Sequence, residues 1–199
     1  MPQLREAGRM SAKPKFAHVV FQTSQPTEMR DWYCTVLDGH VLYQDAALTF
    51  ITFDDEHHRV ALLNPPVPLE RKTPATGAMH HVAYTFENLD DLLDRYVLLR
   101  DQGIRPAVCI AHGVTTSMYY RDPDGNMVEM QIDRFAEPDD ATNYMKGPEY
   151  AADSVGPQFD PEQLLAAYRA GASVEELSDR SWALKSALPD PMPALMGAR

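Results

Sequence analysis

Ala17-His18-Val19-Val20-Phe21 (AHVVF) has a counterpart 63 residues further along the chain, His80-His81-Val82-Ala83-Tyr84 (HHVAY). The same offset of 63 aligns two further pairs of identical residues, Asp31 with Asp94 and Tyr33 with Tyr96. Matches in a single register, on segments with the same expected structure, indicate an internal repeat. Two units with so long a period are not a solenoid. The chain is therefore expected to contain a duplicated module that closes on itself.

Both copies have the same expected order of elements. A short strand of β-branched and aromatic residues is followed by a helix, which ends at Gly39 in the first copy and at Gly103 in the second. Three strand-like runs then follow each helix: HVLYQ (40–44), LTFITF (48–53) and RVALLN (59–64), then RPAVCI (105–110), TTSMYY (115–120) and NMVEMQI (126–132). The sequence predicts an α+β fold in which paired βαβββ modules form a curved mixed sheet around a cleft.

The composition restricts the class of protein. A chain of 199 residues with 44% hydrophobic and 24% charged residues is typical of a soluble globular protein. A formal net charge of −11 argues against a nucleic-acid surface. The sequence contains neither an apolar run long enough to span a membrane nor a secretory signal. Cys34 and Cys109 are too few for a disulfide scaffold, so we expect a cytoplasmic protein without nucleic-acid or membrane partners.

The chain divides into three predicted parts. They are an N-terminal arm (1–14), a domain (15–133, with half-modules at about 15–64 and 78–133) and a C-terminal extension (134–199). The segment 136–158 is rich in Pro, Asp, Gly and Tyr without periodicity, which predicts an extended wrap rather than a second enzyme domain.

The rest of the extension is expected to form short helices. Asp160 begins one that Gly171 ends, and Ser173 begins a second, shorter one. Such amphipathic helices cover the module's own sheet, the mouth of the cleft or a partner subunit, and we favour a lid or a dimer contact. The last residues, from Ala187 onward, are expected to be loose.

Glu129 lies in the middle of the last strand-like run. The preceding Asp122-Pro123-Asp124-Gly125 predicts a tight turn that leads into a strand. Glutamate is disfavoured in strands and costly to bury alone. Its side chain is therefore either on a solvated face or held by a cation, a metal or a hydrogen-bond network.

The repeat suggests partners for this carboxylate. Two modules related by a pseudo-twofold axis place matching first-strand positions across a shared cleft, which brings His18 and His81 together. His80 competes for this role, but only His81 is in register with His18. Taken singly, a strand histidine is more often a core residue than a ligand. Two imidazoles and one carboxylate nevertheless form the facial triad that holds Fe(II) or Mn(II), so we predict a metal centre of His18, His81 and Glu129.

The βαβββ repeat, the AHVVF and HHVAY strands and the DPDGN-x-x-E ending resemble the vicinal oxygen chelate superfamily. Within it, the chain is similar to one-module type I extradiol ring-cleaving dioxygenases of the 2,3-dihydroxybiphenyl 1,2-dioxygenase-like kind, over about residues 15 to 133. The resemblance implies an enzyme of aromatic catabolism that uses Fe(II), with Mn(II) as the alternative. It also implies a catechol-type substrate and O2 as partners, and a homo-oligomer.

Three further positions match the dioxygenase branch. The family's catalytic acid/base histidine stands at a His-x-[hydrophobic]-Ala strand start, which here points to His58. A tyrosine ten residues before the ligand glutamate corresponds to Tyr119, and an upstream His-Gly pair resembles His112-Gly113 with a spacing two residues shorter. In these roles His58 takes a catechol proton and later returns it, and Tyr119 donates a hydrogen bond to a substrate oxygen. The plainer interpretations are that His58 belongs to a solvated turn, that Tyr119 is an ordinary aromatic residue of a strand, and that His112 belongs to a loop.

Alternative functions on the same scaffold stay open. Aligning the fourth strands of the two halves places Ala61 where the counterpart of Glu129 would be. Glyoxalase I-like relatives carry a ligand acid in that strand, so its absence favours oxygen chemistry, which needs open coordination positions for the catechol and O2. The alternatives are another metal-dependent isomerase, epimerase or lyase, and a non-catalytic module that binds a small molecule without a metal.

Overall fold

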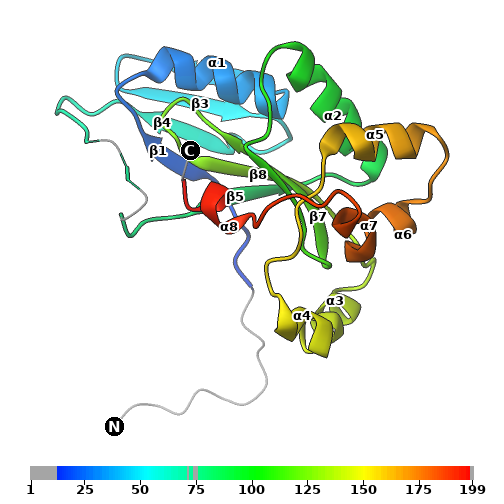
Figure 1. Ribbon diagram of the computed structural model, residues 1–199. Coiled ribbons are helices and arrows are strands. Elements are labelled where there is room, and N and C mark those ends of the chain that lie inside the picture. The colour runs from blue at the N-terminus through cyan, green and yellow to red at the C-terminus, as the bar shows by residue number, and fades with distance from the viewer. Residues whose placement is uncertain (1–12, 71, 74–75, 198–199) are drawn as a thin grey trace, which may run out of the picture.

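The computed structural model describes residues 13–70, 72–73 and 76–197. Most of the predicted N-terminal arm (1–14) lies outside this range. Two four-stranded sheets form the centre of the molecule (Figure 1). In spatial order, the first contains β1 (Val19–Gln22), β4 (Val60–Leu63), β3 (Leu48–Thr52) and β2 (His40–Gln44), and the second contains β5 (His81–Thr85), β8 (Met127–Asp133), β7 (Thr115–Arg121) and β6 (Val108–Ala111).

Both sheets have the same mixed topology. The first strand of each module pairs in parallel with the last, and the remaining pairs are antiparallel. The predicted α+β fold of two βαβββ modules is therefore confirmed, although the strands hydrogen bond into two sheets of four rather than into one.

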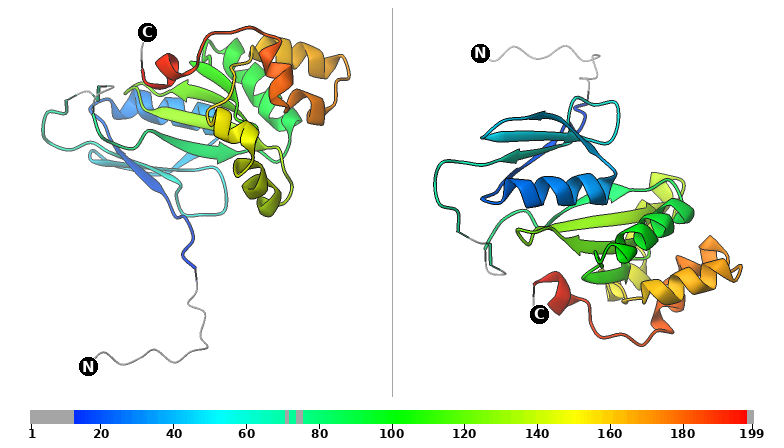
Figure 2. Two further views of the ribbon diagram at one scale, coloured as in Figure 1. Left: turned by 60° about the horizontal axis from the view of Figure 1, so that its bottom comes forward. Right: turned by 90° about the horizontal axis from the view of Figure 1, so that it is seen from above.

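The helices of the two modules, α1 (Pro26–Leu37) and α2 (Leu89–Asp101), lie on the same side of the sheets (Figure 2). Helical periodicity places the apolar residues of each on one buried face, with Met29, Tyr33 and Val36 in α1 and Leu89, Leu92, Leu93, Tyr96 and Leu99 in α2. The opposite face of each sheet is free of these two helices.

The ends of the helices differ in one detail from the prediction. Gly103 has φ 82°, as expected of a glycine that ends a helix. In the first module, however, the left-handed residue is Asp38, with φ 55°. Gly39 is required for a different reason, because a Cβ atom there would lie 2.9 Å from the carbonyl oxygen of Thr52.

The strand registers preserve the repeat. Val20 pairs with Ala61 in the first sheet, and Ala83 pairs with Glu129 in the second. Val20 and Ala83 are themselves related by the offset of 63 residues. Ala61 is therefore the structural counterpart of Glu129, as the alignment of the two halves predicted.

Side chains join the first module to the second. Tyr33 of α1 donates a hydrogen bond to Asp122 Oδ2 at 3.1 Å, and Gln25 donates to Asp124 Oδ1 at 2.6 Å. Both acceptors belong to the turn between β7 and β8. Val128 of β8 also packs into the core that α1 forms with the first sheet. Among the described residues, no strand of one sheet hydrogen bonds to a strand of the other.

The C-terminal extension is more helical than predicted. Its helices are α3 (Pro138–Met145), α4 (Pro148–Ala152), α5 (Pro161–Arg169), α6 (Val174–Leu177), α7 (Arg180–Leu184) and α8 (Met192–Leu195). The extended wrap predicted over 136–158 is therefore wrong for α3 and α4. Each of these begins at a proline, whose fixed φ suits the first helical position. The helix predicted after Asp160 and the shorter one after Ser173 are confirmed.

The extension packs against the domain rather than standing apart from it. It contributes Phe159, Leu164, Leu165, Leu177, Trp182 and Ala183 to the core that α2 and the second sheet form. Of the predicted roles, a cover for the module's own sheet is the one that these contacts support, and the favoured lid or dimer contact stays a prediction. The end of the chain is not loose up to residue 197, because Arg121 donates a hydrogen bond to the Ala194 carbonyl at 2.7 Å. Within the described residues, no helix has the length and apolar character needed to cross a membrane.

Candidate active site

Glu129 is a buried carboxylate on the face of the second sheet opposite α2. Side chains alternate along β8, so Val128 and Met130 point into the cores on the helix side and Glu129 points the other way. Its side chain is 5% exposed, with His81 Nε2 at 3.1 Å from Oε2, and Tyr119 donates a hydrogen bond to Oε1 at 2.8 Å.

The contacts of Glu129 favour its charged form. Burial by itself raises the pKa of this carboxyl, but hydrogen bonds from His81, Ser117 and Tyr119 outweigh burial and hold the pKa below its usual range. The carboxylate is thus an anion that faces an imidazole nitrogen. Burial, together with the charge of Glu129, raises the pKa of the Tyr119 hydroxyl, so this tyrosine remains a proton donor.

His112 extends this group. It lies between β6 and β7, with Nε2 at 2.8 Å from the Tyr119 hydroxyl and 3.9 Å from Glu129 Oε1. The other ring nitrogen, Nδ1, lies 2.5 Å from the Val155 carbonyl oxygen. A carbonyl oxygen only accepts hydrogen bonds, so Nδ1 carries a proton. Burial lowers the pKa of His112, which favours the neutral ring with a free electron pair on Nε2.

A second group of histidines lies in the first module. His18 precedes β1 and His58 precedes β4, and their ring centroids are 4.2 Å apart. His58 also stacks on Phe50, with a centroid distance of 4.4 Å and an interplanar angle of 9°. His57 Nδ1 lies 2.6 Å from His58 Nδ1. Burial lowers the pKa of His58, and the neighbouring His18 and His57 rings add to this shift.

The structure thus brings the six predicted site residues together in two groups. Glu129, His81, Tyr119 and His112 form one, and His18 with His58 forms the other. Over the described part of the chain, no three His, Cys, Asp or Glu side chains form a group that could hold a metal ion. The competing His80 lies between His81 and the end of the chain, with Nδ1 at 2.7 Å from His81 Nδ1 and Nε2 at 3.2 Å from the Leu195 carbonyl oxygen.

The two sheets carry corresponding rows of side chains that differ in chemistry. Paired residues across the second sheet are Ala83, Glu129, Tyr119 and Val108. The corresponding row across the first sheet is Val20, Ala61, Phe50 and Tyr43. A phenyl ring thus replaces the phenol of Tyr119, and a methyl group replaces the carboxylate of Glu129. Sequence reasoning did not identify Phe50 or Val20, but their pairing with Ala61, antiparallel for Phe50 and parallel for Val20, would have located both.

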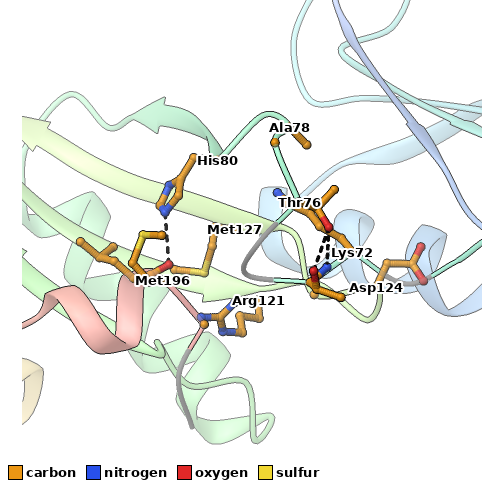
Figure 3. A pocket seen from close by; sticks show the side chains of 13 residues that line it. Lys72, Thr76, Ala78, His80, Arg121, Asp124, Met127 and Met196 are labelled. Atoms are coloured by element: carbon orange, nitrogen blue, oxygen red, sulfur yellow. Dashed lines mark hydrogen bonds between the residues drawn. The ribbon is translucent and has the colours of Figure 1, made fainter.

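A hollow of about 460 Å³ lies next to these groups, between the linker that precedes β5, the ends of β7 and β8, and α8 (Figure 3). The labelled residues that line it are Lys72, Thr76, Ala78, His80, Arg121, Asp124, Met127 and Met196. Neither His81 nor Glu129 lines this hollow, so it is distinct from the carboxylate group described above.

Residues 15–130 match the family model described as the Glyoxalase/Bleomycin resistance protein/Dioxygenase superfamily. The chain is 58% identical over 188 residues to a Rhodococcus globerulus protein named "Biphenyl-2,3-diol 1,2-dioxygenase 2", covering 94% of this chain and 99% of that one. It is 54% identical over 178 residues to "Biphenyl-2,3-diol 1,2-dioxygenase 3" of the same organism, covering 89% of this chain and 94% of that one. A glyoxylase/bleomycin resistance protein/dioxygenase domain from Frankia sp. EAN1pec shares the fold, with a TM-score of 0.53 and 15% identity over 63% of this chain and 96% of that one.

Proposed function

The chain belongs to the glyoxalase/bleomycin resistance protein/dioxygenase superfamily, and we propose that it is an extradiol dioxygenase that cleaves the diol-bearing ring of a biphenyl-2,3-diol next to the diol, using O2. The observation that carries the proposal is the 58% identity to a named biphenyl-2,3-diol dioxygenase, which extends over 94% of this chain and 99% of the relative. The superfamily predicted from the sequence is confirmed by the match to its family model, and the two named relatives of this chain are enzymes.

Two of the three predicted ligands lie together in a way that suits a divalent metal, whereas His18 lies in the other group. Glu129 is an anion whose Oε2 atom faces His81 Nε2 at 3.1 Å, and these are a carboxylate and an imidazole of the kind that bind Fe(II). We assign His18 as the third ligand, on the repeat register that relates it to His81. Fe(II), or Mn(II) in its place, would supply the open coordination positions for two catechol oxygens and O2.

His58 is proposed as the acid/base residue. Its side chain is buried, and its lowered pKa keeps the ring neutral near neutral pH, so that it accepts a proton from a substrate hydroxyl. Its stacking on Phe50 holds the plane of the ring. Holding the ring in place before the substrate arrives reduces the cost of aligning it for proton transfer.

Tyr119 and His112 are proposed to contact the substrate oxygens. The Tyr119 hydroxyl has a single proton, yet it lies 2.8 Å from both His112 Nε2 and Glu129 Oε1. One of these contacts is therefore left without a proton when His112 is neutral. A substrate hydroxyl that donates to His112 Nε2 would supply the missing proton, while Tyr119 continues to donate to an oxygen.

The apolar row on the first sheet suits the second ring of the substrate. Val20 is 50% exposed, and Phe50 lies beside His58 on the same face of the sheet. Ala61, which pairs with both Val20 and Phe50, is small enough to leave space between them. We propose that this row contacts the ring that carries no hydroxyl groups, since aromatic rings pack favourably on such surfaces.

The alternatives are less well supported. A glyoxalase-like isomerase with a fourth protein ligand requires an acid in β4, where this chain has Ala61. A binding module without a metal gives no role to the buried carboxylate of Glu129.

We further propose that the chain is divided into an N-terminal arm (1–14), a domain (15–133) and a C-terminal extension (134–199), and that the protein is a cytoplasmic homo-oligomer. Light scattering of the purified protein tests the oligomeric state.

Anaerobic loading with Fe(II), followed by biphenyl-2,3-diol and air, tests the proposed reaction. The expected result is one O2 consumed per substrate and a yellow ring-opened product. Mn(II)-loaded protein, assayed in parallel, identifies the metal. Bound iron without O2 consumption would contradict dioxygenase function and favour another metal-dependent reaction. Protein that binds the diol equally well with and without metal would favour the binding module.

A further inference from the structure

Arg180 is a buried cation in the C-terminal extension, and its hydrogen bonds go to backbone carbonyls. Its side chain is in α7, and the residue is 4% exposed. It donates to the Asp153 carbonyl at 2.6 Å and also to the His112 carbonyl. Its guanidinium lies over the Tyr144 and Tyr150 rings, at 5.9 and 5.4 Å from their centroids. Arg180 thus joins the loop that carries His112 to a segment of the extension.

That segment, residues 153–159, runs beside the edge strand β6 and pairs with it at Ile110 and Gln158 in the manner of an additional antiparallel strand. The Ala111 amide donates to the Pro157 carbonyl at 2.9 Å, and the Phe159 amide donates to the Cys109 carbonyl at 3.1 Å. The Asp153 carboxylate accepts from the Val155 and Gly156 amides at 3.0 and 2.9 Å. The position of the Val155 carbonyl is therefore set by the Asp153 side chain on one side and by backbone hydrogen bonds to β6 on the other.

Two glycines allow this close approach. Gly156 has φ 94°, and a Cβ atom there would lie 2.1 Å from the Ala111 carbonyl oxygen. Gly113, next to His112, has φ 86°, and a Cβ atom there would lie 2.2 Å from the Tyr144 hydroxyl. Both positions have a left-handed backbone that favours glycine, and at Gly156 the contact with the Ala111 backbone also excludes a side chain.

We propose that the extension fixes both the tautomer and the orientation of His112. Val155 and Arg180 act in this as positioning residues for the active site. The Val155 carbonyl accepts a hydrogen bond from Nδ1–H, and Arg180 donates to the carbonyls of His112 and Asp153 on either side of this contact. The Nε2 atom is thereby left as an acceptor directed at Tyr119. The catalytic consequence rests on the proposed function, whereas the tautomer itself does not.

A purely structural role explains Arg180 less well. The extension is already anchored by its apolar core and by Glu162, which accepts from Tyr96 at 2.7 Å and from Arg100 at 3.0 Å. Burying a charged side chain is costly, and apolar residues of similar size often replace one without loss of stability. The hydrogen bonds from the guanidinium to the carbonyls of His112 and Asp153 align the loop that carries His112.

The test uses full-length Arg180→Met, with Arg180→Lys as the conservative variant and Glu162→Gln as a matched control elsewhere in the extension. Nitrogen-15 NMR of the histidine side chains is recorded on metal-free protein. We expect the Nδ1–H tautomer for His112 in the wild type and in Glu162→Gln. Arg180→Met should show a mixture of tautomers, and Arg180→Lys should restore the wild-type tautomer in part.

The iron-loaded proteins are then compared. A poorly oriented His112 should lower kcat by about 10²-fold in Arg180→Met, with unchanged iron content and little change in KM. Asp153→Ala is a second variant at an exposed position, and it removes the hydrogen bonds that hold the Val155 segment. It should shift the tautomer in the same direction as Arg180→Met and tests the proposal if Arg180→Met does not fold. A wild-type tautomer in both variants would overturn the proposal. Inactive wild-type enzyme with the expected tautomer would contradict the proposed function alone.

Discussion

Tyr119 and Glu129 are direct cross-strand partners on β7 and β8, and the tyrosine hydroxyl donates a hydrogen bond to Glu129 Oε1 at 2.8 Å. The turn from Asp122 to Asn126 closes the hairpin and sets this register, with the Asn126 amide donating to the Asp122 carboxylate at 2.8 Å. The spacing of ten residues between the two is therefore a consequence of strand pairing. A shift of one residue would turn one of the two side chains to the opposite face of the sheet.

Replacing Glu129 with Ala should remove the bound metal and leave the fold intact. The carboxylate supplies the negative charge of the proposed site, and an alanine leaves no buried charge unpaired. Iron is measured after dialysis against a chelator, alongside thermal unfolding. His40→Ala is the control, because His40 is exposed at the start of β2 and is not a predicted ligand, so this variant should keep the metal. Equal iron in the wild type and Glu129→Ala would show that the proposed triad is wrong.

Replacing His58 with Ala should slow ring opening by roughly 10²–10⁴-fold while iron content stays the same. The reason is the loss of a buried base that stacks on Phe50. His57→Ala is the matched control, since the His57 side chain is 69% exposed, and it should have a much milder effect. Product formation and metal content are measured in the same samples. Equal rates for the wild type and His58→Ala would exclude His58 from the mechanism.

Replacing Phe50 with Ala should weaken the use of biphenyl-2,3-diol more than that of unsubstituted catechol. An aromatic contact contributes up to about 1.5 kcal/mol beyond simple burial, which corresponds to about tenfold in affinity. We expect KM for the biphenyl diol to rise by about this factor, with catechol little changed. Leu42→Ala, on β2 outside the paired row and 51% exposed, is the control. A similar rise in KM for both substrates would argue against the second-ring contact, whereas a fall in kcat for both is expected from the lost stacking on His58.

The metal-free protein should become less stable as the pH falls from about 7.5 to about 5. Burial lowers the pKa values of His58 and His112, so the unfolded chain binds more protons than the folded one in this range. The free energy of unfolding therefore rises with pH. Urea unfolding at several pH values measures the slope, and His58→Asn should reduce it. A slope unchanged in that variant would remove His58 from the pH dependence.

Truncation after Arg134 should abolish cooperative unfolding. The deletion removes Leu164 and Trp182, which pack in the same core as α2. Deleting a large buried side chain costs about 2–5 kcal/mol, and this truncation removes several. Truncation after Ala187 is the control, because it retains those residues. Thermal unfolding followed by circular dichroism makes the comparison. An unchanged melting temperature after the longer deletion would show that the extension does not stabilise the domain.

The repeat made much of the fold predictable, because an offset of 63 residues aligned the first strand and the helix of the two modules, and the later strands followed in the same order in both. It also identified Ala61 as the counterpart of Glu129, since strand pairing follows the same register in both halves. The helices α3 and α4 were not predicted, because their sequence lacks an apolar stripe and they have no buried residue. Prolines at their first positions were the available signal.

The contacts of the site were less predictable than its residues. Symmetry placed His18 and His81 at equivalent positions, but the structure gives them different neighbours, His58 in one case and Glu129 in the other. The contact between His112 and Val155 joins residues 43 positions apart, through a segment that has no counterpart in the repeat. Contacts that an irregular segment makes cannot be derived from the register of the strands it covers.

The absence of hydrogen bonds between the two sheets, in the part of the chain that the structure describes, has a mechanical consequence. The two halves of the proposed site are therefore joined by side-chain contacts and not by paired strands. Their separation depends on side-chain contacts between the two modules, which include the hydrogen bonds from Tyr33 to Asp122 and from Gln25 to Asp124. A small change in these contacts alters the width of the opening between the sheets without altering any residue of the proposed site. The range of ring substituents accepted can thus evolve at a distance from the chemistry.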